Sequence, residues 1–339
     1  PIVFLPIPER KYLASAGIKY NFTDNFDVGG NFAFSSYDAN TIAENNSIKN
    51  GLAFEIVSNL KDYKVYENFS FSSSAKHRFI SKEFSSVTRY NSVNFNDNYN
   101  LNGLNTKFND ENLTELQLST TLQNLIKIQA ELGNYNKGNL KSFRQNYNYW
   151  HNFWEYLELN FNSNFVKSND GIRNSNLKDF FVDFSTNKNN NLVIGLSYKN
   201  LYRNVIDKNK IYQLPFEKYQ KYSIYNYFTG SFYKLQYNFE ITQEQGLLAN
   251  KILQQSNNII HNFNASVYGQ NYTISNLLIF RNTKYSKEFR ANGYSDYNSL
   301  TAKNNSFIKL FNFAKIDIYY EITTQKMQTY QKIFIKVKK

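Results

Sequence analysis

The sequence predicts an all-β protein, an antiparallel transmembrane β-barrel of about 14 strands that is either a whole barrel or one part of a larger barrel. Three observations carry this prediction. Apolar and polar residues alternate along many segments, and short polar turns separate some of these segments while longer connections separate others. The segments run to about 9–13 residues, longer than the usual strand of about 5–6 residues. They match the roughly 9–11 residues of a tilted strand that crosses a membrane.

The first element is a hairpin between Tyr12 and Asp38. Its even-numbered residues are apolar or aromatic up to Phe22, and the same parity resumes at Phe26 after the turn Thr23–Asn25. A period of two sends successive side chains to opposite faces of a strand. We therefore expect two strands that share one apolar face and one polar face and are joined by a tight turn.

The two faces of such strands can be assigned if the barrel lies in a membrane. Apolar residues then face lipid and polar residues line the interior, whereas a soluble barrel or sandwich has the reverse arrangement. The clearest lipid-facing candidates are Ile18, Phe32, Phe34, Leu235 and Phe239. The clearest lumen-facing candidates are Lys19, Asn31, Gln236 and Glu240. The lumen candidates carry charges of both signs, so they favour no particular solute.

The alternation continues along the rest of the chain. It recurs at residues 52–56, 63–71, 116–122, 126–132, 157–161, 192–198, 235–241, 263–267, 316–322 and 333–337. The stretch Glu115–Leu132 also resembles a helix, but its apolar positions fit a period of two better on each side of Gln123 and Asn124. We expect long loops near residues 76–110, 164–176 and 286–305. No linker divides the chain, so residues 1–339 are expected to form a single barrel domain or barrel portion.

The composition agrees with a membrane barrel. The chain of 339 residues contains 28 Tyr and 30 Phe but only 13 Gly and 4 Pro, too few for the many tight corners of a sandwich. A mean hydropathy of −0.59 suggests a soluble protein, but alternation cancels in such an average. No run approaches the roughly 18–20 apolar residues of a membrane helix. The absence of cysteine excludes disulfides, thiolate metal sites and a cysteine nucleophile.

The net charge of +12 has two explanations. A basic protein can bind nucleic acid or an anionic lipid surface. Alternatively, the charge reflects a composition rich in Lys, Asn, Ile, Tyr and Phe, as expected of an AT-rich genome. The basic residues are scattered, and arginine, which binds phosphate as a bidentate fork, is scarce. We expect no nucleic-acid partner, and we expect outer-membrane lipids and lipopolysaccharide around the protein.

No motif in the sequence predicts chemistry. The three histidines, His77, His151 and His261, lack the spacing of metal ligands on one element. No phosphate-binding glycine loop occurs, and nothing points to the Ser/His or Asp/His pairs of outer-membrane barrel enzymes. We therefore predict that the protein is not an enzyme and has no catalytic, cofactor-binding or metal site.

Two segments carry a resemblance to a known group of proteins. RYNSVNFNDNYNL (Arg89–Leu101) resembles the RYRSVEFNRDWNL-type segment of large, poorly characterised outer-membrane barrel proteins of Bacteroidota, and QTYQKIFIKVKK (Gln328–Lys339) is similar to a second segment of those proteins. The chain has Asn94 where that group favours Glu, and Tyr99 where it favours Trp. The resemblance implies a location in the bacterial outer membrane, membership of a bigger barrel, and other envelope proteins or lipoproteins as partners.

Three functions remain open at this point. The first is an outer-membrane β-barrel that acts as a transport, secretion or envelope-assembly component. The second is a barrel-anchored structural or adhesive surface protein, whose long loops bind while the barrel only anchors. The third is a soluble, basic all-β protein that binds polyanions. Alternation alone does not say whether the apolar face points inward or outward.

Overall fold

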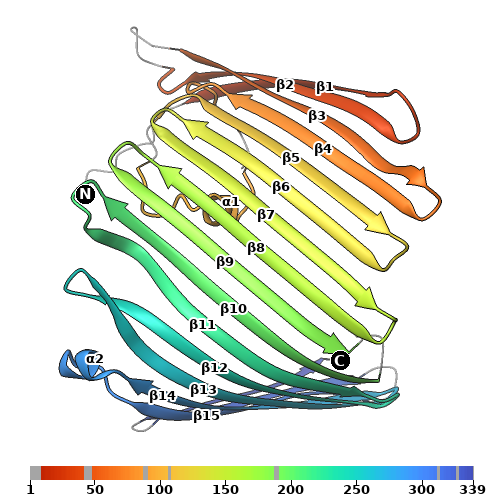
Figure 1. The fold of residues 1–339 in the computed structure, drawn as a ribbon, viewed down its shortest axis with the longest axis vertical. Coiled ribbons are helices and arrows are strands. Elements are labelled where there is room, and N and C mark those ends of the chain that lie inside the picture. Colours follow the sequence, from red (N-terminus) through yellow and green to blue (C-terminus); the bar gives the residue numbers. More distant parts are fainter. Residues whose placement is uncertain are drawn as a thin grey trace. The chain divides into compact units, whose positions relative to one another are not determined.

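The computed structural model describes residues 9–41, 48–86, 91–105, 108–186, 191–310, 314–325 and 328–338. This part of the chain is built from antiparallel strands and contains two short helices, α1 (Phe95–Asn98) and α2 (Lys287–Ala291) (Figure 1). The predicted all-β antiparallel class is confirmed. No helix in the described ranges is long and apolar enough to span a membrane.

The strands within the described ranges number 17, against the predicted 14 or so. They are β1 (Arg10–Asn21), β2 (Phe26–Asp38), β3 (Lys49–Tyr66), β4 (Phe69–Ile80), β5 (Glu111–Leu122), β6 (Ile126–Lys137), β7 (Leu140–Phe153), β8 (Leu157–Asn169), β9 (Arg173–Thr186), β10 (Leu192–Asp207), β11 (Tyr212–Thr229), β12 (Tyr233–Leu248), β13 (Lys251–Tyr268), β14 (Tyr272–Tyr285), β15 (Tyr297–Leu310), β16 (Ala314–Gln325) and β17 (Gln328–Lys338). All of them are longer than the usual globular strand of about 5–6 residues, as the sequence predicted.

Two of the three predicted long loops are shorter than predicted. The loop expected at 164–176 is only a turn, because β8 continues to Asn169 and β9 begins at Arg173. The loop expected at 286–305 ends where β15 begins at Tyr297. The two loop predictions failed for one physical reason. The end of β8, the start of β9 and the start of β15 carry polar residues on both faces, so no alternation marks them. The loop expected at 76–110 is present, although β4 extends into it as far as Ile80.

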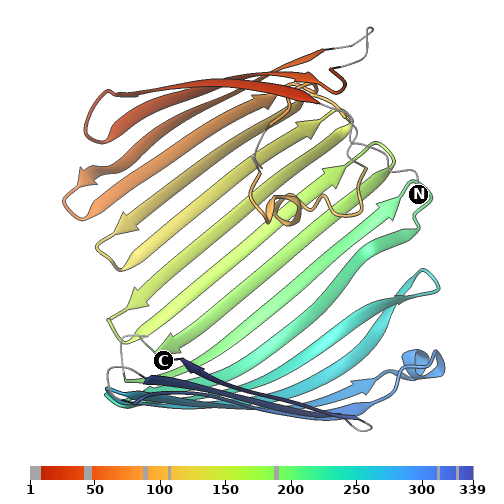
Figure 2. The same cartoon turned by 180° about the vertical axis from the view of Figure 1, so that it is seen from behind.

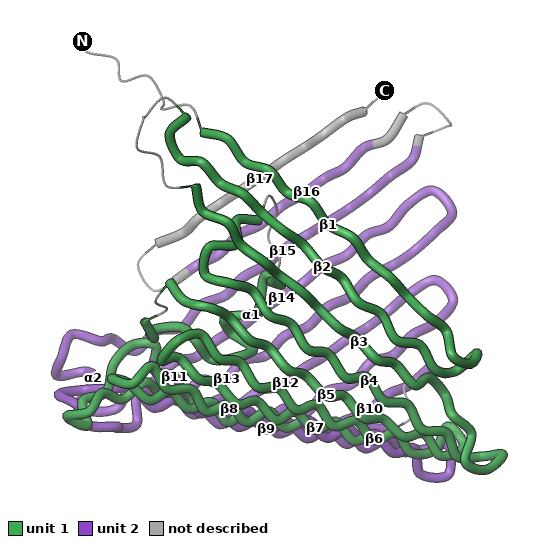
Figure 3. The backbone as a smooth tube through the Cα atoms, turned by 90° about the horizontal axis from the view of Figure 1, so that it is seen from above, with its two compact units in different colours: residues 1–149, 163–178, 203–215 green, residues 150–162, 179–202, 216–339 purple. Residues whose placement is uncertain are grey.

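The chain divides into two compact units, which Figure 3 shows in green and purple. Unit 1 comprises residues 1–149, 163–178 and 203–215, and unit 2 comprises residues 150–162, 179–202 and 216–339. The sequence had suggested a single barrel domain.

Unit 1 contains the predicted hairpin. β1 pairs with β2 from Arg10 opposite Asp38 to Asn21 opposite Asp27. The backbone N–H of Phe26 donates to the Thr23 hydroxyl at 3.0 Å and closes the turn. β3, β4, β5 and β6 follow in antiparallel register, each beside its sequence neighbour. This register keeps one parity of each strand on a common face.

The apolar face of unit 1 is exposed. Ile18 is 72% exposed and Leu52 is 58% exposed, and Phe32 and Ile56 are exposed as well. Neighbouring rings pack along this face, for example Phe54 on Phe79 with 5.5 Å between ring centroids. A soluble sandwich would bury such a face, so the strands of unit 1 present an apolar surface that requires another covering.

Unit 2 repeats this arrangement. β11 to β17 form consecutive antiparallel pairs, each beside its sequence neighbour. Phe239 of β12 lies between Ile224 of β11 and His261 of β13. Ile224 is 51% exposed, and Leu235 and Leu278 are also exposed. The alternation thus has the same consequence in both units, an exposed apolar face opposite a polar face.

Candidate functional site

The candidate site is the polar face of unit 1, which the strand register assembles from residues far apart in the sequence. One row of paired positions crosses the sheet from Lys19 through Gly29, Val57, Lys76 and Glu115 to Gly133. Neighbouring rows bring Asp27, Arg78 and Glu131 to the same face. Side chains of opposite charge therefore lie within reach of one another along this face.

One ion-pair cluster surrounds Asp27 at the turn end of β2. Lys19 Nζ lies 3.4 Å and Lys61 Nζ lies 3.2 Å from Asp27 Oδ2. The Asn59 amide donates to Asp27 Oδ1 at 2.8 Å. The carboxylate is buried while both ammonium groups remain largely exposed. Lys19, a predicted lumen-facing residue, is thus held on the polar face by a charged partner.

A further ion pair and a hydrogen bond to the same carboxylate lie deeper on this face. Arg78 Nη2 lies 2.8 Å from Glu111 Oε1, and both side chains are buried. Tyr135 also donates to Glu111, at 3.1 Å. Removing one partner of a buried pair leaves an uncompensated charge and typically costs about 3–5 kcal/mol. These contacts therefore constrain the polar face more than exposed pairs would.

The connection between β4 and β5 covers part of the polar face. We call its described residues 81–86 and 91–105 the folded insert. Figure 2 shows this connection, which carries α1, lying across one face of the sheet. Phe95, Tyr99 and Leu101 of the folded insert form a small hydrophobic core with residues of the strands beneath, Leu113, Tyr135 and Leu140. Leu113 is 1% exposed.

The spacing of the insert's aromatic residues explains how α1 packs. Phe95 and Tyr99 stand four residues apart, a spacing that places two side chains on the same side of a helical turn. Their ring centroids are 4.9 Å apart, and Phe95 meets Tyr135 edge to face at 5.1 Å. This one helical turn is therefore held by packing against the strands.

Serine hydroxyls of the strands bind the backbone of the folded insert. Ser142 and Ser168 both donate to the carbonyl oxygen of Tyr99, at 2.8 Å and 2.7 Å. The Asn100 amide donates to Ser175 at 2.6 Å, and Asn100 has a positive φ of 49°. These groups are buried, and buried polar groups are costly when they lack a hydrogen-bond partner. The insert is thus bound at specific positions on the sheet.

Two glycines allow the insert to approach the strands closely. A Cβ atom added at Gly51 would overlap the backbone of Phe84 and Glu83. A Cβ added at Gly133 would overlap the phenol end of Tyr99. Only glycine permits such close contacts without movement of the neighbouring group.

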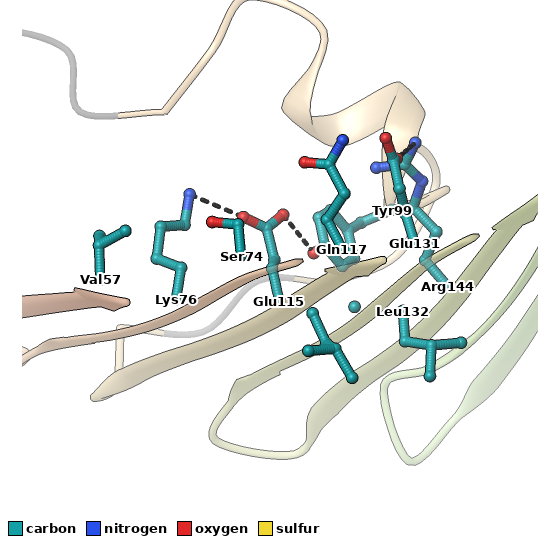
Figure 4. Close-up of a pocket in the computed structure, with 11 residues that line it drawn as sticks. Val57, Ser74, Lys76, Tyr99, Glu115, Gln117, Glu131, Leu132 and Arg144 are labelled. Carbon is teal, nitrogen blue, oxygen red and sulfur yellow. Dashed lines mark hydrogen bonds and ion pairs between the residues drawn. The ribbon is translucent and has the colours of Figure 1, made fainter. Parts of the chain in front are cut away.

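A pocket of about 270 Å³ opens beside Tyr99. Figure 4 shows Lys76, Glu115, Glu131 and Arg144 on one side of the strands, and Leu132 on the other side. Lys76 Nζ lies 2.7 Å from Glu115 Oε2, and Arg144 Nη2 lies 3.1 Å from Glu131 Oε2. The pocket is lined by cations and carboxylates in pairs.

Tyr99 completes the hydrogen bonding of this pocket. Its hydroxyl donates to Glu115 Oε1 at 2.8 Å. Burial, together with the charge and hydrogen bond of Glu115, raises the pKa of the Tyr99 phenol well above its ordinary value. The phenol therefore stays neutral and donates a hydrogen bond across the physiological pH range.

The candidate residues named from the sequence divide between the two faces of the strands. Ile18, Phe32 and Phe34 share one face of unit 1, and Lys19 and Asn31 share the other. In unit 2, Leu235 and Phe239 lie opposite in parity to Gln236 and Glu240. The assignment of these faces to lipid and lumen stays a prediction.

Each predicted lumen residue of unit 2 has a polar partner. The Gln236 side chain accepts a hydrogen bond from Asn264 at 3.2 Å, and Glu240 pairs with Lys221 at 2.5 Å. These two residues belong to unit 2, whereas Lys19 and Asn31 belong to unit 1.

The histidines do not form a shared site. His77 Nδ1 lies 2.9 Å from the Thr114 hydroxyl, and His261 Nδ1 lies 2.9 Å from the Tyr237 hydroxyl. The His151 ring lies against Phe153, with 3.7 Å between centroids. Among the residues that the structure describes, no three His, Asp or Glu side chains gather as metal ligands.

Sequence reasoning missed the central residues of the site, Tyr99, Lys76 and Glu115. The sequence contained one indication that the folded insert covers part of the polar face. Leu113, Tyr135 and Leu140 are large apolar residues that the structure places on the polar side of their strands, under the folded insert. An apolar residue at a polar-face position indicates that something packs on that face.

Comparisons with known proteins give similarity to solved structures only. No protein-family model matches the chain, and no curated protein matches it. The chain is similar to the ferric preacinetobactin receptor BauA from Acinetobacter baumannii, with 10% identity, a TM-score of 0.47 and coverage of 96% of this chain. It spans 61% of the length of that receptor.

Two other solved structures are similar. The siderophore receptor PirA from Pseudomonas aeruginosa shares 8% identity at a TM-score of 0.41, with coverage of 96% of this chain and 69% of the receptor. A bacterial polysaccharide outer membrane secretin shares 8% identity at a TM-score of 0.38, with coverage of 85% of this chain and 89% of the secretin.

Proposed function

We propose that this chain belongs to an outer-membrane β-barrel that acts as a transport, secretion or envelope-assembly component. The main support is the difference between the two faces of the strands. Large apolar side chains such as Ile18 and Leu278 are exposed on one face. Charged residues such as Glu111 are buried and paired on the opposite face. Lipid is the covering that such an apolar face requires, and a polar interior is the usual counterpart.

The paired charges argue against the soluble, polyanion-binding alternative. Lys19, Lys61 and Lys76 each lie within 3.4 Å of a carboxylate oxygen, and Arg78 lies within 2.8 Å of one. A polyanion site needs cations that are available to phosphate or sulfate groups. A water-exposed apolar face would also forgo about 25 cal/mol for each Å² of apolar surface left unburied.

The barrel's partners follow from this proposal. The apolar faces would contact outer-membrane lipids and lipopolysaccharide. Other envelope proteins or lipoproteins would bind at the connections between strands. The folded insert narrows the space above the polar face of unit 1, so it would limit what passes along that face.

A second candidate, a barrel-anchored structural or adhesive surface protein, is favoured by the same folded insert. An insert that is held by a hydrophobic core and by buried hydrogen bonds suits a barrel that is filled rather than open. In this case the connections would bind a partner and the barrel would only anchor them.

Ion conductance in planar bilayers tests the proposal. We would compare the intact protein with a variant in which residues 91–105 are replaced by a glycine–serine linker. A transport or secretion component should conduct, and removal of the insert should raise its conductance. A protein that inserts into the bilayer and stays silent with and without the insert would contradict transport and favour the anchor.

A further inference from the structure

We infer that the polar face of unit 2 carries a binding site for a neutral saccharide. The site is a pocket of about 340 Å³ that lies on β9 to β12. Its volume falls at the small end of the range for ligand pockets, about 300–1,000 Å³. The inference rests on the proposed function in one respect, because a saccharide can reach the pocket only if the polar face lines an aqueous space.

Aromatic rings form one wall of this pocket on the side of the strands where polar residues prevail. Tyr225 and Tyr227 of β11 lie in the same parity as Ser223, opposite Asn238 and Gln236 of β12. Their ring centroids are 5.1 Å apart with an angle of 30° between the planes, and Phe181 also lines the pocket. Three rings thus give one side of the pocket an aromatic surface among polar residues.

The ring of Tyr225 is held rigidly. Its hydroxyl donates to Asp183 Oδ1 at 2.6 Å, and both residues are buried. The ring lies directly over Gly195, where an added Cβ would overlap it. A rigid aromatic surface binds with a small loss of conformational entropy.

Charged groups flank the rings, and each lysine has its own carboxylate. Lys221 Nζ lies 2.5 Å from Glu240 Oε2, and Lys199 Nζ lies 3.5 Å from Asp179 Oδ2. An anionic ligand would need cations without partners, and a purely apolar ligand would leave these ions without solvent. The arrangement favours a neutral ligand with many hydroxyl groups.

A pyranose ring meets both requirements. One face of the sugar presents C–H groups, which can pack on an aromatic ring. Its edge presents hydroxyls, each of which accepts from an ammonium and donates to a carboxylate. Hydrogen bonds to charged groups are the stronger class, so ion pairs beside aromatic rings suit this ligand.

Calorimetric titration of the full chain tests the inference. The protein would be folded in dimethyldodecylamine oxide micelles, because maltoside detergents carry a sugar headgroup. The probes would be maltohexaose, cellohexaose and chitohexaose. We expect saturable binding of at least one. Tyr227→Ala should weaken that binding about tenfold or more, and Tyr227→Phe should retain it.

Tyr222→Ala is the matched control. Tyr222 lies on the same strand, but it belongs to the opposite, exposed face. Its truncation should leave saccharide binding unchanged. Absence of binding to all three probes by the folded protein would overturn the inference, as would equal losses in Tyr227→Ala and Tyr222→Ala. Binding of a tryptophan-containing peptide with none of the saccharides would also overturn it.

Gel mobility of the same samples separates this inference from the proposed function. A barrel that shifts in mobility on boiling and binds no saccharide refutes the saccharide site alone. A protein without the shift that remains soluble without detergent refutes the membrane barrel, whatever the calorimetry shows.

Discussion

The hydroxyl of Tyr99 donates to Glu115 at 2.8 Å, while the ring of Tyr99 lies over Gly133 of the neighbouring strand. Tyr99 belongs to the folded insert, and Glu115 belongs to the polar face of β5. This single contact therefore joins a connection between strands to the charged surface beneath it. It makes the insert a specific part of the polar face, and each of the first three predictions concerns this attachment.

Gly51→Ala should detach the first part of the insert. The new methyl group would overlap the backbone of Phe84, which cannot give way as a flexible side chain could. We expect faster cleavage by trypsin after Lys82 in the folded protein. Gly29→Ala is the control, because its methyl group would meet only the Ile18 carbonyl oxygen at 3.6 Å, an ordinary contact. Equal cleavage of both variants would contradict the close approach.

Tyr99→Phe should weaken the attachment without removing the ring. The change deletes the donor to Glu115, and a hydrogen bond to a charged group contributes about 1.5–3 kcal/mol. The measurement is hydrogen exchange of the amides of residues 95–101, which should speed up by the corresponding factor. Tyr66→Phe, at an exposed position of β3, should leave this exchange unchanged. Unaltered exchange in Tyr99→Phe would show that packing alone holds the insert.

Acid should loosen the end of the folded insert at Asn105, whose backbone N–H donates to the Asp170 carboxylate. Burial raises the pKa of this carboxyl, but the backbone N–H groups of Asn105, Arg173 and Ile172 and the Arg173 side chain outweigh it and lower the pKa to about 2. Because the folded-state pKa lies below the ordinary value of 3.8, the stabilisation that the Asp170 carboxylate gives the folded protein is fully present above pH 3.8. It is lost as the pH falls toward 2.

Pepsin digestion at pH 4 and at pH 2 measures this effect. The measured quantity is the ratio of cleavage near residues 95–105 at pH 2 to that at pH 4. This ratio should be larger for the native protein than for Asp170→Asn. The asparagine variant lacks the carboxylate that accepts from Asn105, so its insert should be loosened already at pH 4. The same ratio in both proteins would contradict a role for Asp170.

Neighbouring residues of β1 should respond very differently to replacement by arginine. Ile18 is on the exposed apolar face, and Ile18→Arg at mid-depth of a bilayer should cost about 2–4 kcal/mol. Lys19 lies on the polar face beside Asp27, so Lys19→Arg should cost little. Urea titration of the protein folded into lipid vesicles gives both values. Equal costs would refute the assignment of the two faces.

The sequence predicted the parts of the fold that depend on alternation. The Tyr12–Asp38 hairpin, its turn and the opposite faces of Ile18 and Lys19 follow from a period of two alone. The start of β9 and the start of β15 were taken for loops because they carry polar residues on both faces, which removes the pattern there. A strand of this kind is stabilised by pairing with its neighbours, and its own sequence does not predict it.

The attachment of the folded insert was beyond sequence reasoning for a different reason. The contact of Tyr99 with Glu115 depends on the path of the chain between β4 and β5, which no local pattern specifies. The hydroxyls of Ser142 and Ser168 bind the insert, yet serines are common on any polar face. The large apolar residues Leu113 and Leu140 on that face were the one usable signal.

Gel mobility is the most direct test of the central claim that the apolar faces meet lipid in the outer membrane. The intact parent protein would be taken from the sarkosyl-insoluble fraction of the bacterial envelope and run with and without boiling. A closed, detergent-resistant barrel should shift in mobility on boiling. A protein that is found in the soluble fraction and shows no shift would contradict the membrane barrel.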